Sequence, residues 1–267
     1  MTRAGTVKTV TSPANPLVKA ARALHMRKNR AETGLFLAEG AKLVRDALAA
    51  GWPPTMVFAR EPATDDDPAA DVAAKVRAAG GDIIFASTAV MEKLARRDNP
   101  QTVIGLFEQR FADPKRLNKG TLVAIEEPRD AGNLGTIIRT VDGLGGAGVL
   151  LIGNTVDPFG VEAVRATMGS IFHVPLARLD RAAFTAFAKR YRHPIIGTHL
   201  CGTTDIRDLS PSEPQMLLMG TEQSGLTDEA AALATMLTKI PMAGTADSFN
   251  LAVATALSLY ELRRPFL

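Results

Sequence analysis

The sequence has few of the features that mark secreted, membrane or metal-dependent proteins. Its single cysteine, Cys201, excludes an internal disulfide, and a reducing cytoplasm is the simplest location. No apolar run reaches the roughly 18 residues of a membrane-spanning helix, and the N-terminal residues lack the apolar centre of a secretory signal. The four histidines and Cys201 lack the spacing of metal ligands, so we expect no metal site.

Common nucleotide-binding and hydrolase motifs are also missing. Neither a P-loop nor a nucleophile elbow occurs. Residues 143–148 read GLGGAG, which matches the dinucleotide-binding pattern letter by letter. That pattern must follow a strand and open a helix, whereas here an expected helix precedes it and an expected strand follows. We therefore predict that these glycines end a helix and turn the chain.

Aromatic residues are scarce, whereas positive charge is concentrated near the N-terminus. Only 5% of residues are aromatic, with Trp52 the single tryptophan, which argues against nucleic-acid recognition by extensive base stacking. Residues 1–45 carry nine lysines or arginines against two glutamates, a net charge of +7, although the whole chain is only +3. Such a cluster is typical of phosphate binding, and a solvated helix face is the alternative. The candidate polyanion-binding residues are Lys19, Arg22, Arg27, Lys28 and Arg30.

The chain is long enough for nearly two domains. Residues 15–30 are expected to form one basic amphipathic helix, with Leu17, Ala21 and Leu24 on one side. Further on, apolar strands alternate with helices, which favours a parallel sheet covered by helices. These strands are expected at 35–40, 55–60, 81–87 and 102–108. A polar stretch with proline and glycine, residues 111–120, is interpreted as a linker between domains 1–110 and 121–267.

The second half repeats the alternation and is expected to be a larger α/β domain. Its strands are expected at 121–126, 148–153, 172–176, 194–199, 215–219 and 238–242. Its helices are expected near 133–143, 159–168, 181–191, 227–236 and 248–263.

Three segments of this half share one form, in which an apolar strand is followed by a turn and then a helix. Such turns line the crevice at the carboxyl ends of parallel strands, where ligands bind. In the first segment Asn133 is the expected helix start, and Arg139 shares the face of Gly135 if that glycine points outward. A surface arginine in a helix is the plain alternative.

The second and third segments each place polar groups beside a turn. Glu222 follows a very apolar strand between Gly220 and Gly225, and Thr227 is expected to cap the next helix, which would leave Glu222 merely exposed. Ser248 is expected to cap a helix that is apolar nearly all round, with Asn250 on its first turn. Simple capping is the alternative to a functional role for these two residues. A helix of this composition is expected to be buried against the sheet or a partner subunit.

Together the three segments resemble the three ordered motifs of the SpoU (TrmH-type) RNA ribose 2′-O-methyltransferases of the SPOUT class. The first matches through Asn133, Gly135 and Arg139; the second through Gly220, Glu222 and Gly225; the third through residues 240–242, Ser248 and Asn250. Residues 164–175 resemble the family's connecting segment. The N-terminal region is similar to the ribosomal-protein-like substrate-binding domain that many members carry.

This resemblance implies a fold, a cofactor and an assembly. The fold would be α/β, with a C-terminal trefoil-knotted parallel-sheet domain and a smaller N-terminal α/β RNA-binding domain; residues 238–267 would pass through the loop at 194–220. S-adenosylmethionine would bind across the three turns, and the protein would be a homodimer. The implied cofactor-binding residues are Leu218, Gly220, Ile240, Met242 and Phe249.

The resemblance also implies an activity, the methylation of a ribose 2′-hydroxyl in structured RNA, with 23S ribosomal RNA favoured. Arg139 would hold the adjacent phosphate and polarise the hydroxyl, and Glu222 would orient its guanidinium. Asn133, Ser248 and Asn250 would position ribose and cofactor. The alternatives are a tRNA 2′-O-methyltransferase, a non-catalytic RNA-binding protein on the same fold, and a flavodoxin-like nucleotide enzyme that leaves the basic N-terminus unexplained.

Overall fold

The computed structural model describes residues 4–62, 64, 67–96 and 98–267. Internal contacts divide the chain into two compact units. Met1–Gln109 and Phe159–Phe172 form the first unit, and Arg110–Pro158 and His173–Leu267 form the second. None of the helices in these ranges is long and apolar enough to cross a membrane.

The first unit is a five-stranded sheet with helices on it. Its elements are β1 (Val7–Val10), α1 (Pro16–Ala23), α2 (Arg27–Thr33), β2 (Leu35–Glu39), α3 (Ala41–Ala49), β3 (Met56–Ala59), α4 (Pro68–Ala78), β4 (Asp82–Ala86), α5 (Thr88–Ala95) and β5 (Val103–Glu108), with α7 (Val161–Ala166) and the 3₁₀ turn η2 (Ser170–Phe172) added from later in the chain. The strand order is β1-β4-β3-β5-β2. All four predicted strands are confirmed, and β1 is an edge strand that the sequence analysis missed.

Two expectations for this unit were wrong. The sheet is mixed, because β5 runs antiparallel to both β2 and β3. An apolar pattern specifies a strand without its direction, which depends on where the connection returns. The single helix expected over residues 15–30 is two helices, separated at Leu24–Met26. Residues Ala21 and Leu24 are buried as expected, and Leu17 is partly buried.

An aromatic cluster explains why residues 159–172 belong to the first unit. Phe36 of β2 packs against Phe159 with ring centroids 4.8 Å apart, and Phe107 of β5 lies 4.9 Å from Phe172. Trp52 meets Phe172 edge-on at 5.5 Å. Residues 159–172 therefore complete the core of the first unit, although they had been predicted to belong to the second domain.

The second unit is a seven-stranded sheet in which every neighbouring pair is parallel, in the order β10-β12-β9-β11-β6-β7-β8. Its strands are β6 (Thr121–Glu126), β7 (Gly148–Ile152), β8 (Leu176–Leu179), β9 (Ile195–Thr198), β10 (Thr204–Asp205), β11 (Gln215–Met219) and β12 (Met236–Lys239). Its helices are α6 (Ala131–Gly143), α8 (Arg181–Ala188), α9 (Asp228–Ala231) and α10 (Leu251–Arg263), with 3₁₀ turns η1 (Pro114–Arg116), η3 (Ile206–Asp208) and η4 (Arg264–Phe266). The predicted parallel sheet is confirmed here. β8 and β12 are displaced along the chain from their expected ranges, and β10 was not expected.

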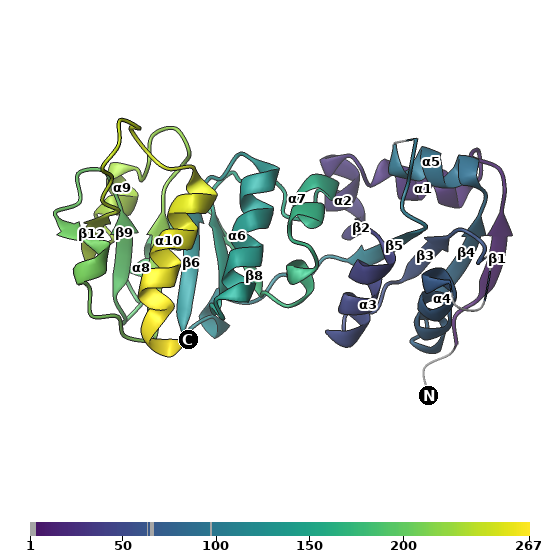
Figure 1. Ribbon diagram of the computed structural model, residues 1–267, viewed down its shortest axis with the longest axis horizontal. Helices are drawn as coiled ribbons and strands as arrows, with labels where there is room; N and C mark the ends of the chain where they lie inside the picture. The colour runs from purple at the N-terminus through teal and green to yellow at the C-terminus, as the bar shows by residue number, and fades with distance from the viewer. Residues whose placement is uncertain (1–3, 63, 65–66, 97) are drawn as a thin grey trace. The chain divides into compact units, whose positions relative to one another are not determined.

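Alternate residues of the central strands face opposite layers of helices, as the pleat requires. Leu122, Ala124 and Leu218 pack in the cluster that contains α8 and α9 residues. On the other face, α6 and α10 lie side by side and contact the central strands (Figure 1).

The glycines at 143–148 end α6 and lead into β7, as predicted, with Gly145 at φ +64° and Gly148 at φ +151°.

Polar contacts hold the C-terminal turn of α10 to the amino ends of β6 and β11. Arg263 Nη1 donates to Glu213, and Arg263 Nε donates to the Leu144 carbonyl at 2.9 Å. Glu213 also accepts from Thr121 Oγ1 at 2.8 Å. The side chains of Arg263 and Glu213 are only 12% and 18% exposed, so the loss of one would leave the other partly buried without its counter-ion.

Arg263→Ala should therefore lower the free energy of unfolding by about 2–4 kcal/mol, because removing one partner of a buried pair leaves an uncompensated charge. Urea denaturation followed by circular dichroism measures the change. The matched control is Arg264→Ala, whose guanidinium is 60% exposed and 3.5 Å from Glu261; it should cost less than about 0.5 kcal/mol. Equal effects of the two substitutions would contradict the buried network.

Candidate active site

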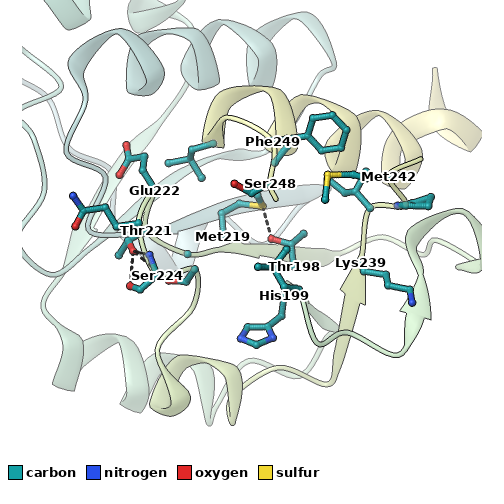
Figure 2. A pocket seen from close by; sticks show the side chains of 18 residues that line it. Thr198, His199, Met219, Thr221, Glu222, Ser224, Lys239, Met242, Ser248 and Phe249 are labelled. Carbon is teal, nitrogen blue, oxygen red and sulfur yellow. Dashed lines mark hydrogen bonds between the residues drawn. The ribbon is translucent and has the colours of Figure 1, made fainter. Parts of the chain in front are cut away.

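A cavity of about 500 Å³ opens at the carboxyl ends of β9, β11 and β12. The loops after these strands and the start of α10 form its walls (Figure 2). Parallel strands bring their carboxyl ends to one edge of a sheet, so loops distant in sequence meet there. The lining residues are Thr198–Leu200, Met219–Gly225, Lys239–Met242, Ser248, Phe249, Leu251 and Ala254.

The loop after β11 is closed tightly on itself. The backbone N–H of Thr221 donates to the Gly225 carbonyl at 2.9 Å, and that of Gly225 donates back to Thr221 at 3.2 Å. A Cβ on Gly220 would lie 1.9 Å from the carbonyl carbon of Gly225, which no side chain allows. Glycine at position 220 thus permits the backbone to fold over itself at the cavity wall.

The side chains around the cavity divide into an apolar and a polar group. Figure 2 shows Met242 and Phe249 on one side, with Glu222 on the other. Met242 and Phe249 are 37% and 39% exposed, so both offer apolar surface to the cavity that they line. Met219 lies between the two sides of the cavity, and its sulfur accepts a hydrogen bond from Thr198 Oγ1 at 3.3 Å. The apolar side suits a flat ring, and the polar side offers backbone and carboxylate groups.

Glu222 contacts the loop that leads into α6. Its carboxylate accepts from the backbone N–H of Arg129 at 3.3 Å and from that of Asp130 at 3.4 Å. Glu222 was predicted to orient the guanidinium of Arg139; the hydrogen bonds that the structure gives its carboxylate come from these two backbone amides. Glu222 thus contacts the loop from which α6 starts.

The two helix starts are capped differently from the prediction. Asp130 caps α6, accepting from the Asn133 N–H at 2.6 Å, so Asn133 lies inside the first turn. Asn250 rather than Ser248 caps α10, accepting from Ala252 N–H at 2.9 Å. The spare amide of Asn250 donates to Asn133 Oδ1 at 3.0 Å. One side-chain contact therefore joins the first and third motifs.

Arg139 is exposed on α6, beyond Asn133 along the helix. Gly135 is buried, so the condition under which these two residues would share an outward face is not met. The small residue instead belongs to the side of α6 that packs inward with Leu134 and Ile138. Arg139 itself lies on the exposed face of α6.

A cluster of charges fixes the end of β6. Glu126 is only 2% exposed and accepts from Thr227 N–H at 3.0 Å and Thr227 Oγ1 at 2.8 Å; it also pairs with Arg181 at 3.1 Å. Glu127 accepts from Arg181 Nε at 3.1 Å and from Arg129 Nη2 at 2.8 Å. The hydrogen bond from Arg181 keeps the pKa of the Glu127 carboxyl below its ordinary value. Glu127 adopts φ +43°, a left-handed conformation that costs of order 1–3 kcal/mol in a residue other than glycine.

The predicted cofactor-binding residues separate into four that line the cavity and one that does not. Gly220, Ile240, Met242 and Phe249 lie in its wall. Leu218 is fully buried in the core of the sheet, one residue before the lining begins. Of the predicted catalytic residues, Glu222 and Ser248 are in the lining, whereas Asn133, Arg139 and Asn250 lie on the adjoining helices.

The sequence analysis missed part of the wall, namely Thr198, His199, Leu200, Met219 and Lys239. Thr198 ends β9, and His199 and Leu200 follow it in a turn that was not considered when the strand was predicted. The signal was available, since that turn lies at the same edge of a parallel sheet as the others. His199 Nδ1 accepts from the Cys201 N–H at 3.1 Å, which shapes this turn.

The basic residues predicted to bind phosphates differ in their exposure. Lys19, Arg27 and Lys28 are exposed, and Arg22 is partly exposed. Arg30 is only 5% exposed, and its Nη1 donates to the carbonyls of Leu24 at 2.7 Å and His25 at 3.0 Å. Its guanidinium thus satisfies backbone oxygens after α1 and is little exposed, which argues against the predicted contact of Arg30 with phosphates. No group of three or more potential metal ligands gathers within the described ranges.

Two protein-family models match this chain. Residues 120–260 match the SpoU rRNA Methylase family, and residues 15–105 match the MRM3-like substrate binding domain. A 23S rRNA (uridine(2479)-2′-O)-methyltransferase from Streptomyces viridochromogenes is 30% identical over 89% of this chain and 85% of its own. The 23S rRNA (guanosine(2553)-2′-O)-methyltransferase RlmP of Bacillus subtilis is 28% identical over 96% of this chain and all of its own.

Solved structures agree over almost the whole length. The crystal structure of an AdoMet-bound rRNA methyltransferase from Sinorhizobium meliloti has a TM-score of 0.91 and 46% identity, covering 98% of this chain and 99% of that chain. The SpoU methyltransferase AviRb from Streptomyces viridochromogenes, in complex with AdoMet, has a TM-score of 0.83 and 27% identity, covering 94% and 98%. With the family match spanning more than half of the residues, this chain belongs to the SpoU rRNA methylase family.

Proposed function

We propose that the protein transfers a methyl group from S-adenosylmethionine to a ribose 2′-hydroxyl of 23S ribosomal RNA. The observation that carries this proposal is the meeting of three loops around one cavity, beside the helix that bears Arg139. Both curated relatives described above are named as 23S rRNA 2′-O-methyltransferases. Such a substrate places the enzyme in the cytoplasm.

The cavity fits the proposed cofactor in size and in chemistry. Its volume of about 500 Å³ lies within the range of small-molecule sites. Met219, Met242 and Phe249 offer apolar surface to an adenine ring, and the backbone of Gly220 and Ile240 offers polar groups at close approach. When bound, S-adenosylmethionine supplies an electrophilic methyl group on its sulfonium.

The residues of the chain act by placing and polarising the acceptor. Arg139 holds the RNA phosphate next to the acceptor ribose and polarises the hydroxyl; a guanidinium stays protonated in proteins and is a poor proton acceptor. Asn133, fixed by Asn250 at 3.0 Å, orients the ribose. Glu222 sets the start of α6 through its two backbone contacts, and Ser248 lies in the cavity wall. Alignment of this kind contributes about 7–11 kcal/mol to a two-reactant step.

The first unit grips folded RNA through phosphate contacts. Lys19, Arg22, Arg27 and Lys28 supply the positive charge, and Arg30 supports the helix end behind them. The match of residues 15–105 to a substrate-binding domain supports this division. Phosphate contacts position an RNA without reading its sequence, so the target nucleotide is selected by RNA shape.

The second unit is proposed to contain a trefoil knot, in which residues 238–267 pass through the loop at 194–220. The connectivity supports this. β12 adds beside β9, yet the next helix, α10, packs on β6 and β11 at the centre of the sheet. The chain must therefore return across its own earlier connections after β12.

The protein is also proposed to be a homodimer that uses the outer face of α10. Val253, Leu257 and Tyr260 are 46%, 41% and 49% exposed and repeat at helical spacing, while the opposite face packs against the sheet. An apolar stripe of this kind is typical of an interface between subunits.

Leu257→Lys should therefore convert the dimer into a monomer, because a buried ammonium at the centre of an apolar interface lacks a partner. Size-exclusion chromatography with light scattering measures the change in mass. Val7→Lys, which replaces an apolar side chain of similar exposure (47%) in the first unit, is the control and should leave the mass unaltered. A Leu257→Lys protein that keeps the wild-type mass would exclude this interface.

Transfer of radiolabelled methyl from S-adenosylmethionine tests the activity itself. Unmodified 23S rRNA and total tRNA serve as parallel substrates, and nuclease mapping locates the product. Labelled 2′-O-methylribose in 23S rRNA is the expected result. Label in tRNA alone would change the substrate, and label in neither RNA would favour a non-catalytic RNA-binding protein.

A further inference from the structure

Arg181, the first residue of α8, bridges two adjacent carboxylates. Its Nη1 lies 3.1 Å from Glu126, and its Nε donates to Glu127 at 3.1 Å. Glu126 is almost fully buried, and the Glu127 side chain is 16% exposed. Two neighbouring carboxylates so placed repel each other unless a cation lies between them, and the planar fork of arginine can serve both at once.

The backbone that this bridge holds is in an unfavourable conformation. Glu127 has φ +43°, and its carboxylate accepts further bonds from Arg129 Nη2 at 2.8 Å and from the Asn154 N–H at 3.4 Å. A Cβ on Gly153 would lie 2.7 Å from Glu127 Oε1, so the neighbouring turn is shaped around this carboxylate. Side-chain contacts of Glu127 thus hold a backbone that local preference opposes.

The same backbone leads directly into the proposed catalytic helix. Two residues after Glu127, the amide of Arg129 donates to Glu222, and Asp130 caps α6. Three residues farther on, Asn133 receives the hydrogen bond from Asn250. A change in the loop at 127–130 therefore moves the start of α6 relative to the second and third motifs.

We propose that Arg181 is a positioning residue for methyl transfer, which acts by bridging Glu126 and Glu127 and so fixing the loop from which α6 starts. Arg181 does not line the cavity of about 500 Å³ and contributes no atom to its wall. Its effect falls on the alignment of Asn133 and Arg139, and hence on kcat, with little change in cofactor affinity. The inference rests on the proposed function.

The kinetic test compares Arg181→Ala with Arg190→Ala, which removes the same charge from an exposed position just after the same helix. Arg181→Ala should lower kcat at least about tenfold, while the Kd for S-adenosylmethionine and the KM for RNA change less than about threefold. Arg181→Lys should recover only part of the loss, because one ammonium cannot serve both carboxylates in the plane of a guanidinium. Adding Glu127→Gln to Arg181→Ala should also recover part, because it removes the repulsion.

Hydrogen exchange supplies a readout that does not depend on activity. The amides of Arg129 and Asp130, which donate to Glu222, should exchange at least about tenfold faster in Arg181→Ala than in Arg190→Ala, whereas β6 amides should not change. Unchanged protection of these two amides, or equal kcat values for Arg181→Ala and Arg190→Ala, would overturn the proposal. If wild-type protein methylates no RNA, the proposed function fails, and the exchange measurement still decides whether Arg181 fixes the loop.

Discussion

Replacing Arg139 with alanine should reduce kcat for methyl transfer by about 10³-fold, because one preorganised cationic donor at a reacting centre contributes about 10²–10³-fold or more. Arg139 lies on the exposed side of α6 and does not line the cavity. The Kd for S-adenosylmethionine should therefore change less than about threefold. Single-turnover methylation of RNA and calorimetric titration of the cofactor separate the two effects.

Arg139→Lys distinguishes a general positive charge from a planar, two-pronged contact. Lysine keeps the charge but cannot donate two parallel hydrogen bonds to a phosphate, so it should restore less than about a tenth of the lost activity. Thr136→Ala, at an exposed position one turn earlier on α6, is the control and should retain most of the activity. Near-wild-type turnover of Arg139→Lys would refute the planar-contact mechanism.

Gly220→Ala should weaken S-adenosylmethionine binding by about 100-fold, because the added methyl group forces the loop after β11 to open. The new Cβ would lie 1.9 Å from the Gly225 carbonyl carbon and 2.1 Å from the Leu226 nitrogen. Both are backbone atoms that cannot rotate away, unlike the end of a flexible side chain. Calorimetric titration of the purified variant measures the affinity.

Gly143→Ala is the matched control for this substitution. It lies at the end of α6, and a Cβ there meets nothing within 4 Å. This variant should bind the cofactor as the wild type does. RNA binding by the first unit should be unchanged in both variants, because the affected loop lies wholly in the second unit. Cofactor affinity within about threefold of wild type in Gly220→Ala would show that the loop is not part of the binding site.

Most strands of the second unit followed from the sequence to within a few residues, although β10 was not expected. β6 and β11 occupy their predicted ranges, because each is a continuous apolar run bounded by polar or turn residues. α6 and α10 start within three residues of their expected positions. The capping residues were less well predicted. Asp130 caps α6, which had been expected to start at Asn133, and Asn250 caps α10, where Ser248 had been expected. Several cap-forming residues stand close together there, and local sequence does not choose among them.

Long-range contacts account for the other differences. The antiparallel direction of β5 depends on its neighbours in the sheet, which a local pattern does not encode. Arg30 belongs to a basic cluster that predicts phosphate binding, yet its guanidinium donates hydrogen bonds to backbone carbonyls just after α1. Residues 159–172 read as an ordinary helix and turn, but their aromatic rings complete a cluster around Phe36.

The sequence by itself determined the α/β class and the three strand-turn-helix segments, because periodicity and turn composition are local properties. Only the tertiary structure decided that Glu222 binds the loop before α6, that Asn250 reaches Asn133, and that Arg181 joins Glu126 to Glu127. Each of these contacts joins positions some 50 to 120 residues apart, and it exists because a parallel sheet brings the carboxyl ends of its strands to one edge.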